Sequence, residues 1–118
     1  MEINGLKIVP EADLRGAKLS VYSIVPEEGG FIAYKAVKGC IVKLFVPDDA
    51  ERVSIPTSRK CRASYVIVLE GEGRGIHDGS VYYKPGACIR ADKWDPDIRK
   101  ECTHGIHFFM TRAEAEDY

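Results

Sequence analysis

The chain has 118 residues, of which 45% are hydrophobic and 30% charged, a composition typical of one compact domain and not of a disordered chain. Its 17 basic and 18 acidic residues give a net charge of -1, which argues against binding to duplex nucleic acid or to an acidic membrane. No apolar stretch is long enough to span a bilayer, and the first residues lack the features of a signal peptide. We therefore expect a soluble cytoplasmic protein in which residues 1–118 form a single domain.

The amino-terminal region contains two consecutive five-residue units at residues 12–21, with Leu14 and Leu19 at equivalent positions. This pattern is typical of pentapeptide repeats, whose units stack into a coil and need several copies to bury an apolar face. Two units predict a repeat remnant, and chance similarity in a polar loop is the alternative.

The middle of the chain predicts antiparallel strands. Two runs rich in β-branched and aromatic residues, 31–37 and 40–46, flank Lys38-Gly39 and predict a β-hairpin. The most apolar stretch, 63–70, predicts a central strand buried on both faces. Residues 71–79 carry four glycines and predict a mobile surface loop.

The rest of the chain predicts a second hairpin and then a change of periodicity. Residues 81–84 and 87–90 flank Pro85-Gly86, which is typical of a turn. An Asp-Pro pair at 95–96 predicts a short helix over 96–102. Residues 106–110 predict a strand, and the capping box that begins at Thr111 predicts a final helix over 112–118.

These elements together predict an α+β domain. Its core, residues 31–118, is a mainly antiparallel β-sheet of about six short strands with two or three short helices.

Four motifs in this order resemble an uncharacterised bacterial and phage domain that is often fused behind pentapeptide repeats. They are Tyr34-Lys35, the Arg-Lys-Cys-Arg segment 59–62, Glu101-Cys102, and the Gly-Ile-His-Phe-Phe sequence 105–109. The resemblance implies a domain of unknown function, located in the host cytoplasm if a phage encodes it, and it supplies no tested chemistry. It also supports the interpretation of residues 12–21 as a repeat remnant.

The densest polar cluster is the segment 57–62, with three basic side chains, two hydroxyls and a thiol. The guanidinium groups of Arg59 and Arg62 suit a phosphate or carboxylate, and Lys60 adds a compact charge. The alternative is a solvated connection whose charges pair with nearby acidic residues. The flanking cations would also lower the pKa of the Cys61 thiol, which leaves nucleophilic catalysis open.

The segment 101–107 contains three transition-metal donors, Cys102, His104 and His107, and Cys61 could supply a fourth. Because these donors come from a helix end, a turn and a strand, their convergence is not guaranteed. The four cysteines contain no CxxC pair, and we expect reduced thiols. We predict no structural zinc and no cofactor.

His107 lies between two apolar residues of the predicted strand 106–110. Alternation places Ile106, Phe108 and Met110 on the likelier core face, which leaves His107 facing a cleft. The alternative is a covered, neutral histidine that is hydrogen-bonded to backbone. The sequence 105–108 is also similar to a strand of ADP-ribosyltransferases, although the expected earlier histidine and later glutamate are missing.

We favour the interpretation that this is a binding domain without catalytic residues, whose partner is a small anionic ligand such as a nucleotide. The candidate ligand-binding residues are Tyr34, Lys35, Arg59, Lys60, Arg62, Glu101, Cys102 and His107. In a phage, sequestering a host nucleotide would be one use. Two alternatives are a protein-interaction module without a small ligand and an NAD-using transferase. The sequence leaves homo-oligomer formation open.

Overall fold

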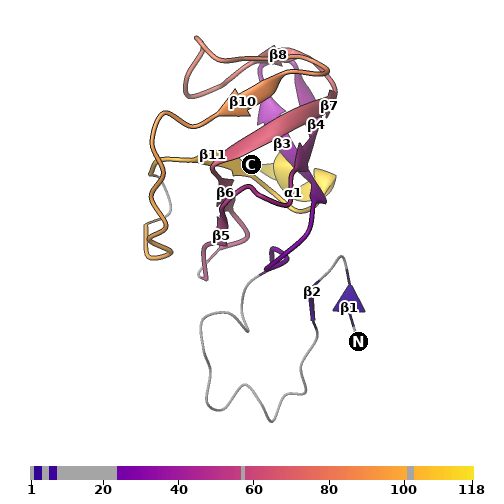
Figure 1. The fold of residues 1–118 in the computed structure, drawn as a ribbon. Coiled ribbons are helices and arrows are strands. Elements are labelled where there is room, and N and C mark those ends of the chain that lie inside the picture. The colour runs from indigo at the N-terminus through magenta and orange to yellow at the C-terminus, as the bar shows by residue number, and fades with distance from the viewer. Residues whose placement is uncertain (1, 4–5, 8–23, 57, 101–102) are drawn as a thin grey trace.

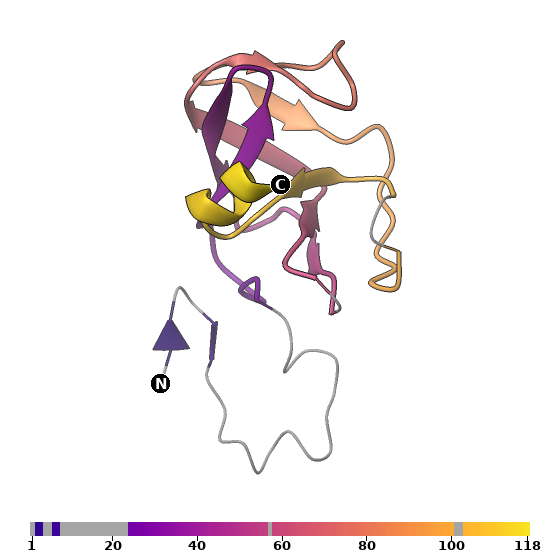
Figure 2. The same ribbon diagram turned by 180° about the vertical axis from the view of Figure 1, so that it is seen from behind.

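The computed structural model describes residues 2–3, 6–7, 24–56, 58–100 and 103–118 (Figures 1 and 2). The predicted repeat remnant, residues 12–21, lies outside the described residues. In the amino-terminal segment, β1 (Glu2–Ile3) pairs with β2 (Leu6–Lys7).

A four-stranded antiparallel sheet carries most of the core. Its strand order is β10-β7-β4-β3, formed by β3 (Phe31–Val37), β4 (Cys40–Val46), β7 (Tyr65–Glu70) and β10 (Cys88–Arg90). The predicted hairpin is confirmed, because β3 and β4 pair along their whole length around Gly39, whose φ of 92° suits glycine at the turn.

A second, three-stranded sheet has the order β11-β6-β5. It consists of β5 (Arg52–Ser54), β6 (Cys61–Ala63) and β11 (Ile106–Phe108), so the predicted strand at 106–110 is confirmed in a shorter form. The prediction of one strand over 63–70 is wrong. Ser64 interrupts it, donating its N–H to Glu51 and accepting from Ala91, so the chain passes there from the second sheet to the first.

The two sheets meet where β3 passes the end of β11. Tyr34 and Phe109 exchange two backbone hydrogen bonds of 2.8 Å each. This isolated bridge joins the edge strands of the two sheets. It also fixes which β3 side chains face β11.

The predicted second hairpin is wrong in its pairing. β9 (Tyr82–Tyr83) pairs with β8 (Gly73–Arg74), whereas β10 pairs with β7. The turn at Pro85-Gly86 exists, but Gly86 and Ala87 form backbone hydrogen bonds with Val68, which direct the chain onto β7. The segment predicted as a glycine-rich loop therefore contains a strand, β8.

The prediction of an α+β fold with two or three helices is wrong. Among the described residues the structure is an antiparallel β fold with one short helix, α1 (Arg112–Asp117), which is capped by Thr111 as predicted. The described part of 96–102 forms only a turn. The carbonyls of Asp95, just before this segment, and of Asp97, within it, accept hydrogen bonds from the Arg62 side chain.

The core lies on one face of the four-stranded sheet, and α1 packs against β3 and β4 (Figure 2). Val42, Leu44 and Val46 of β4 are completely buried, as the alternation of that strand predicts. Among the described residues, no helix is long and apolar enough to cross a membrane.

Candidate functional site

A cavity of about 340 Å³ lies beside the junction of the two sheets. β3 and β11 form part of its wall, together with the segment before β6, the loop after β8, the end of β10 and the last residue of the chain. Its polar lining consists of Lys35, Lys60, His77, Asp78, Tyr83, Arg90, Asp92, His107 and Tyr118. Three of the predicted site residues, Lys35, Lys60 and His107, therefore line one cavity.

Lys35 occupies a core-facing position of β3. It alternates with Ala33 and Val37, which are 0% and 4% exposed, so its side chain starts on the buried face of the sheet. Its Nζ donates a hydrogen bond of 2.9 Å to the backbone oxygen of His107 and lies 5.8 Å from the ring centre of Tyr83. Burial, and secondarily the charge of Lys60, lowers the pKa of Lys35 to about 8.

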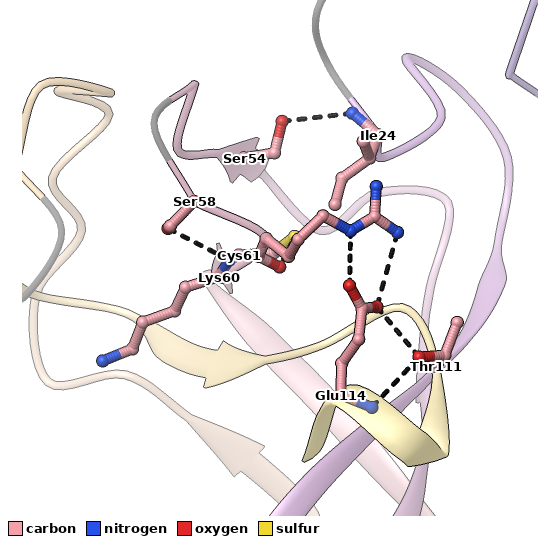
Figure 3. A network of polar contacts seen from close by, with 8 residues as sticks. Ile24, Ser54, Ser58, Lys60, Cys61, Thr111 and Glu114 are labelled. Atoms are coloured by element: carbon pink, nitrogen blue, oxygen red, sulfur yellow. Dashed lines mark hydrogen bonds and ion pairs between the residues drawn. The ribbon is translucent and has the colours of Figure 1, made fainter. Parts of the chain in front are cut away.

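Lys60 approaches the same cavity from the segment before β6. Its side chain is buried, with only 2% of the residue exposed. Its Nζ donates a hydrogen bond of 2.7 Å to the hydroxyl of Tyr118 and lies 4.7 Å from the centre of the same ring. Figure 3 shows the Lys60 side chain extending away from Glu114, on the other side of the segment.

His107 contributes a neutral ring from β11. Its Nε2 lies 3.1 Å from the backbone oxygen of Thr103, so this nitrogen carries the proton and donates. Burial, followed by the charges of Lys60 and Lys35, lowers the pKa of His107 to about 4. The lowered pKa and the backbone hydrogen bond match the alternative of a neutral, backbone-bonded histidine, although the ring also lines a cavity.

Arg59 and Arg62 point to different partners. Arg59 forms an ion pair with Glu114 of α1, with Nη2 3.4 Å from Oε1, and Thr111 donates to the same carboxylate (Figure 3). Arg62 is completely buried, and its Nη atoms donate to the carbonyls of Asp95, Asp97 and His104 over 2.7–3.3 Å. Neither of these guanidinium groups lines the cavity.

The other predicted site residues lie elsewhere or are not described. Tyr34 lies on the opposite face of β3 from Lys35 and lines a second hollow with Met110. Glu101 and Cys102 lie outside the described residues. The expectation of an activated thiol at Cys61 is wrong, because burial raises the pKa of that thiol to about 12 and outweighs the nearby Arg59 charge.

Two acidic residues of the cavity wall are engaged at its exposed edge. Asp78 accepts hydrogen bonds from the backbone and hydroxyl of Ser80, which lower its pKa. Asp92 lies 3.5 Å from the ring of His104. Within the described part of the chain, no three His, Cys, Asp or Glu side chains are grouped closely enough to hold a metal ion.

Sequence reasoning missed the aromatic part of the cavity. Tyr118 packs against Phe109, 5.1 Å between ring centres, and against His77 at 6.4 Å, and thereby joins the end of α1 to the loop after β8. The capping box locates the helix, but no local pattern indicates that the residue after it reaches Lys60. The result is a cavity lined by two lysine amines, a neutral histidine and aromatic side chains.

A family model described as a family of unknown function (DUF5758) matches residues 21–115, so the chain belongs to this family. This agrees with the resemblance to an uncharacterised domain that the sequence motifs indicate. Searches of curated proteins and of solved structures gave no match.

Proposed function

We propose that this protein binds a small anionic ligand, phosphate- or nucleotide-like, in the cavity beside the junction of the two sheets. The observation that carries the proposal is the presence of two lysine side chains, the half-buried Lys35 and the buried Lys60, in the wall of one cavity. Each amine comes from a different element, and their charges are close enough for Lys60 to lower the pKa of Lys35.

Without a bound anion, the charged form of Lys35 is unfavourable in the folded protein. A shift of one pKa unit corresponds to about 1.4 kcal/mol, so a pKa lowered from 10.5 to about 8 destabilises the charged form of Lys35 by on the order of 3 kcal/mol. A bound anion would offset this penalty, because it places opposite charge beside both amines. The Lys35 charge that weakens the fold would thereby strengthen ligand binding.

The size of the cavity restricts the ligand. A volume of about 340 Å³ lies near the lower end of the range for small-molecule sites. It favours a phosphorylated metabolite or a mononucleotide over a dinucleotide such as NAD. Tyr83 and Tyr118 would provide the apolar walls against which a ring could pack. If a phage encodes the protein, sequestering a host nucleotide would be one use of the site.

The proposal is tested by calorimetric titration of the full chain with inorganic phosphate and with adenosine monophosphate. Hydrogen bonds to charged groups contribute about 1.5–3 kcal/mol each, so K35M and K60M should each weaken binding roughly tenfold or more. K84M removes an exposed lysine outside the cavity and is the matched control. Thermal unfolding of each variant establishes that it is folded. Binding that is unchanged in both cavity variants, or absent from the wild type for both probes, would contradict the proposal.

A further inference from the structure

Three features of the Lys35 amine bear on its reactivity. Its side chain starts on the core face of β3, it ends in the wall of a cavity, and its Nζ is held by a single backbone acceptor, the His107 oxygen, among the hydrogen bonds of the described residues. No ion pair between described residues includes it. These features are also those of a lysine that reacts through its nitrogen.

We propose that Lys35 captures a small carbonyl compound that carries an anionic group, such as a 2-oxo acid, by forming a Schiff base inside the cavity. The inference rests on the proposed function in one respect: Lys60 would hold the anionic group of the same molecule. The ligand class is thereby narrowed from any small anion to an anionic aldehyde or ketone.

The reaction needs the neutral form of the amine. A lysine in water is neutral in only roughly three molecules in ten thousand at pH 7. With a pKa of about 8, roughly one Lys35 in ten is neutral at that pH. Burial and a neighbouring cation are the two physical means by which lysine nucleophiles are activated, and here both act on one nitrogen.

The contact with His107 orients the amine without blocking it. A carbonyl oxygen only accepts, so it engages an N–H of Lys35 and leaves the lone pair of the neutral amine free of that contact. The His107 ring is itself neutral above about pH 4 and adds no positive charge. The other charged or titratable groups that line the cavity are Lys60, His77, Asp78, Tyr83, Arg90, Asp92 and Tyr118.

The chemistry balances without an oxidant or a reductant. The nitrogen lone pair attacks the carbonyl carbon, the π electrons move to oxygen, and a proton passes from nitrogen to that oxygen to give a carbinolamine. The nitrogen then expels the hydroxyl group, which leaves with a second proton as water, and a carbon–nitrogen double bond remains. One amine and one carbonyl thus give one imine and one water, and the reaction is reversible.

The test is reductive trapping of the full chain with pyruvate and sodium cyanoborohydride, whose hydride converts the imine into a stable secondary amine. Intact-mass spectra count the adducts, and peptide mapping of the wild-type protein locates them without any variant. We expect Lys35 to be labelled at least tenfold faster than exposed Lys38 and Lys84 at pH 7, because its neutral fraction is roughly 300 times that of a lysine in water. Inorganic phosphate should slow this labelling, and acetone, which has no charge, should label Lys35 more slowly than pyruvate.

A Lys35 adduct that forms selectively and is lost in K35M but not in K84M supports the inference. Labelling of Lys35 no faster than that of Lys84 overturns it. Phosphate binding by calorimetry without any Lys35 adduct overturns the inference that Lys35 acts as a nucleophile, but it leaves the proposed function standing. Equal labelling by pyruvate and acetone, unaffected by phosphate, overturns the anionic ligand class and with it the proposed function, while the reactive amine stands.

Discussion

Replacing Lys35 by methionine should make the protein more stable at neutral pH. In the folded state the pKa of Lys35 is lowered from 10.5 to about 8, so the unfolded chain binds more protons between these two values. The stability of the wild type therefore increases as the pH rises from about 8 to about 10.5, and below pH 8 the full penalty applies. Methionine has a similar length and carries no charge, so K35M avoids this penalty.

The magnitude follows from two opposing terms. Removing the charge stabilises the folded state by on the order of 3 kcal/mol at pH 7. Losing the hydrogen bond to the His107 oxygen destabilises it by about 1 kcal/mol. We expect K35M to be more stable than the wild type by about 2 kcal/mol at pH 7, and slightly less stable near pH 10.5, where only the lost hydrogen bond counts.

The assay is urea unfolding of the wild type, K35M and the exposed control K84M at pH 7 and at pH 10. Other groups titrate over this range, but they are common to the three proteins, so the differences between the proteins isolate the substituted lysine. A difference between K35M and the wild type that does not change with pH would refute the reasoning. So would a K35M variant that is less stable than the wild type at pH 7.

Three further predictions concern the stability of the fold and the protonation of His107. R62M should lower the free energy of unfolding by more than about 3 kcal/mol in urea titrations, because it leaves buried carbonyls without their donor. R59A removes an exposed ion pair and should change the free energy of unfolding by less than about 1 kcal/mol. Similar effects of the two substitutions would contradict this prediction. In NMR titrations the His107 ring should stay neutral down to about pH 4. Because the unfolded chain protonates this ring near pH 6.5, the contribution of His107 to stability declines as the pH falls from about 6.5 to about 4. Protonation near pH 6.5 in the folded protein would be inconsistent with the cavity described. G105A should lower the melting temperature, because the φ angle of Gly105 is 142° and a Cβ there would lie 3.1 Å from side-chain atoms of Arg62 and Trp94. An unchanged melting temperature would contradict this prediction and show that the turn accommodates a Cβ.

The sequence predicts those elements whose signals are local. The β3–β4 hairpin follows from alternation around a glycine turn, and the start of α1 follows from the hydroxyl of Thr111 and its partner Glu114. The errors lie where a distant partner decides. Ser64 ends β6 because its backbone bonds to Glu51 and Ala91, and the predicted helix at 96–102 gives way to a turn whose carbonyls Arg62 engages.

The candidate site shows the same division. The three basic residues of the segment 59–62 look equivalent in the sequence. In the structure, however, Arg59 pairs with a residue of α1, Lys60 lines the cavity and Arg62 lies in the interior. Which of them faces the cavity depends on how β6 sits between β5 and β11, and this is a pairing between segments far apart in the chain. Lys35 carries a clearer signal, because it interrupts an otherwise apolar alternation in β3.

The site is a consequence of how the two sheets are joined. The Tyr34–Phe109 bridge fixes the register of β3 against the end of β11, so that the next β3 side chain, Lys35, reaches the backbone of His107. The second sheet carries His107 in β11, and Lys60 immediately precedes its strand β6. Neither sheet alone supplies both amines, so a cavity with two cations exists only while the junction is intact. An anionic ligand bound in the cavity would therefore stabilise the junction itself. Ligand binding and folding should then be coupled most strongly at this junction.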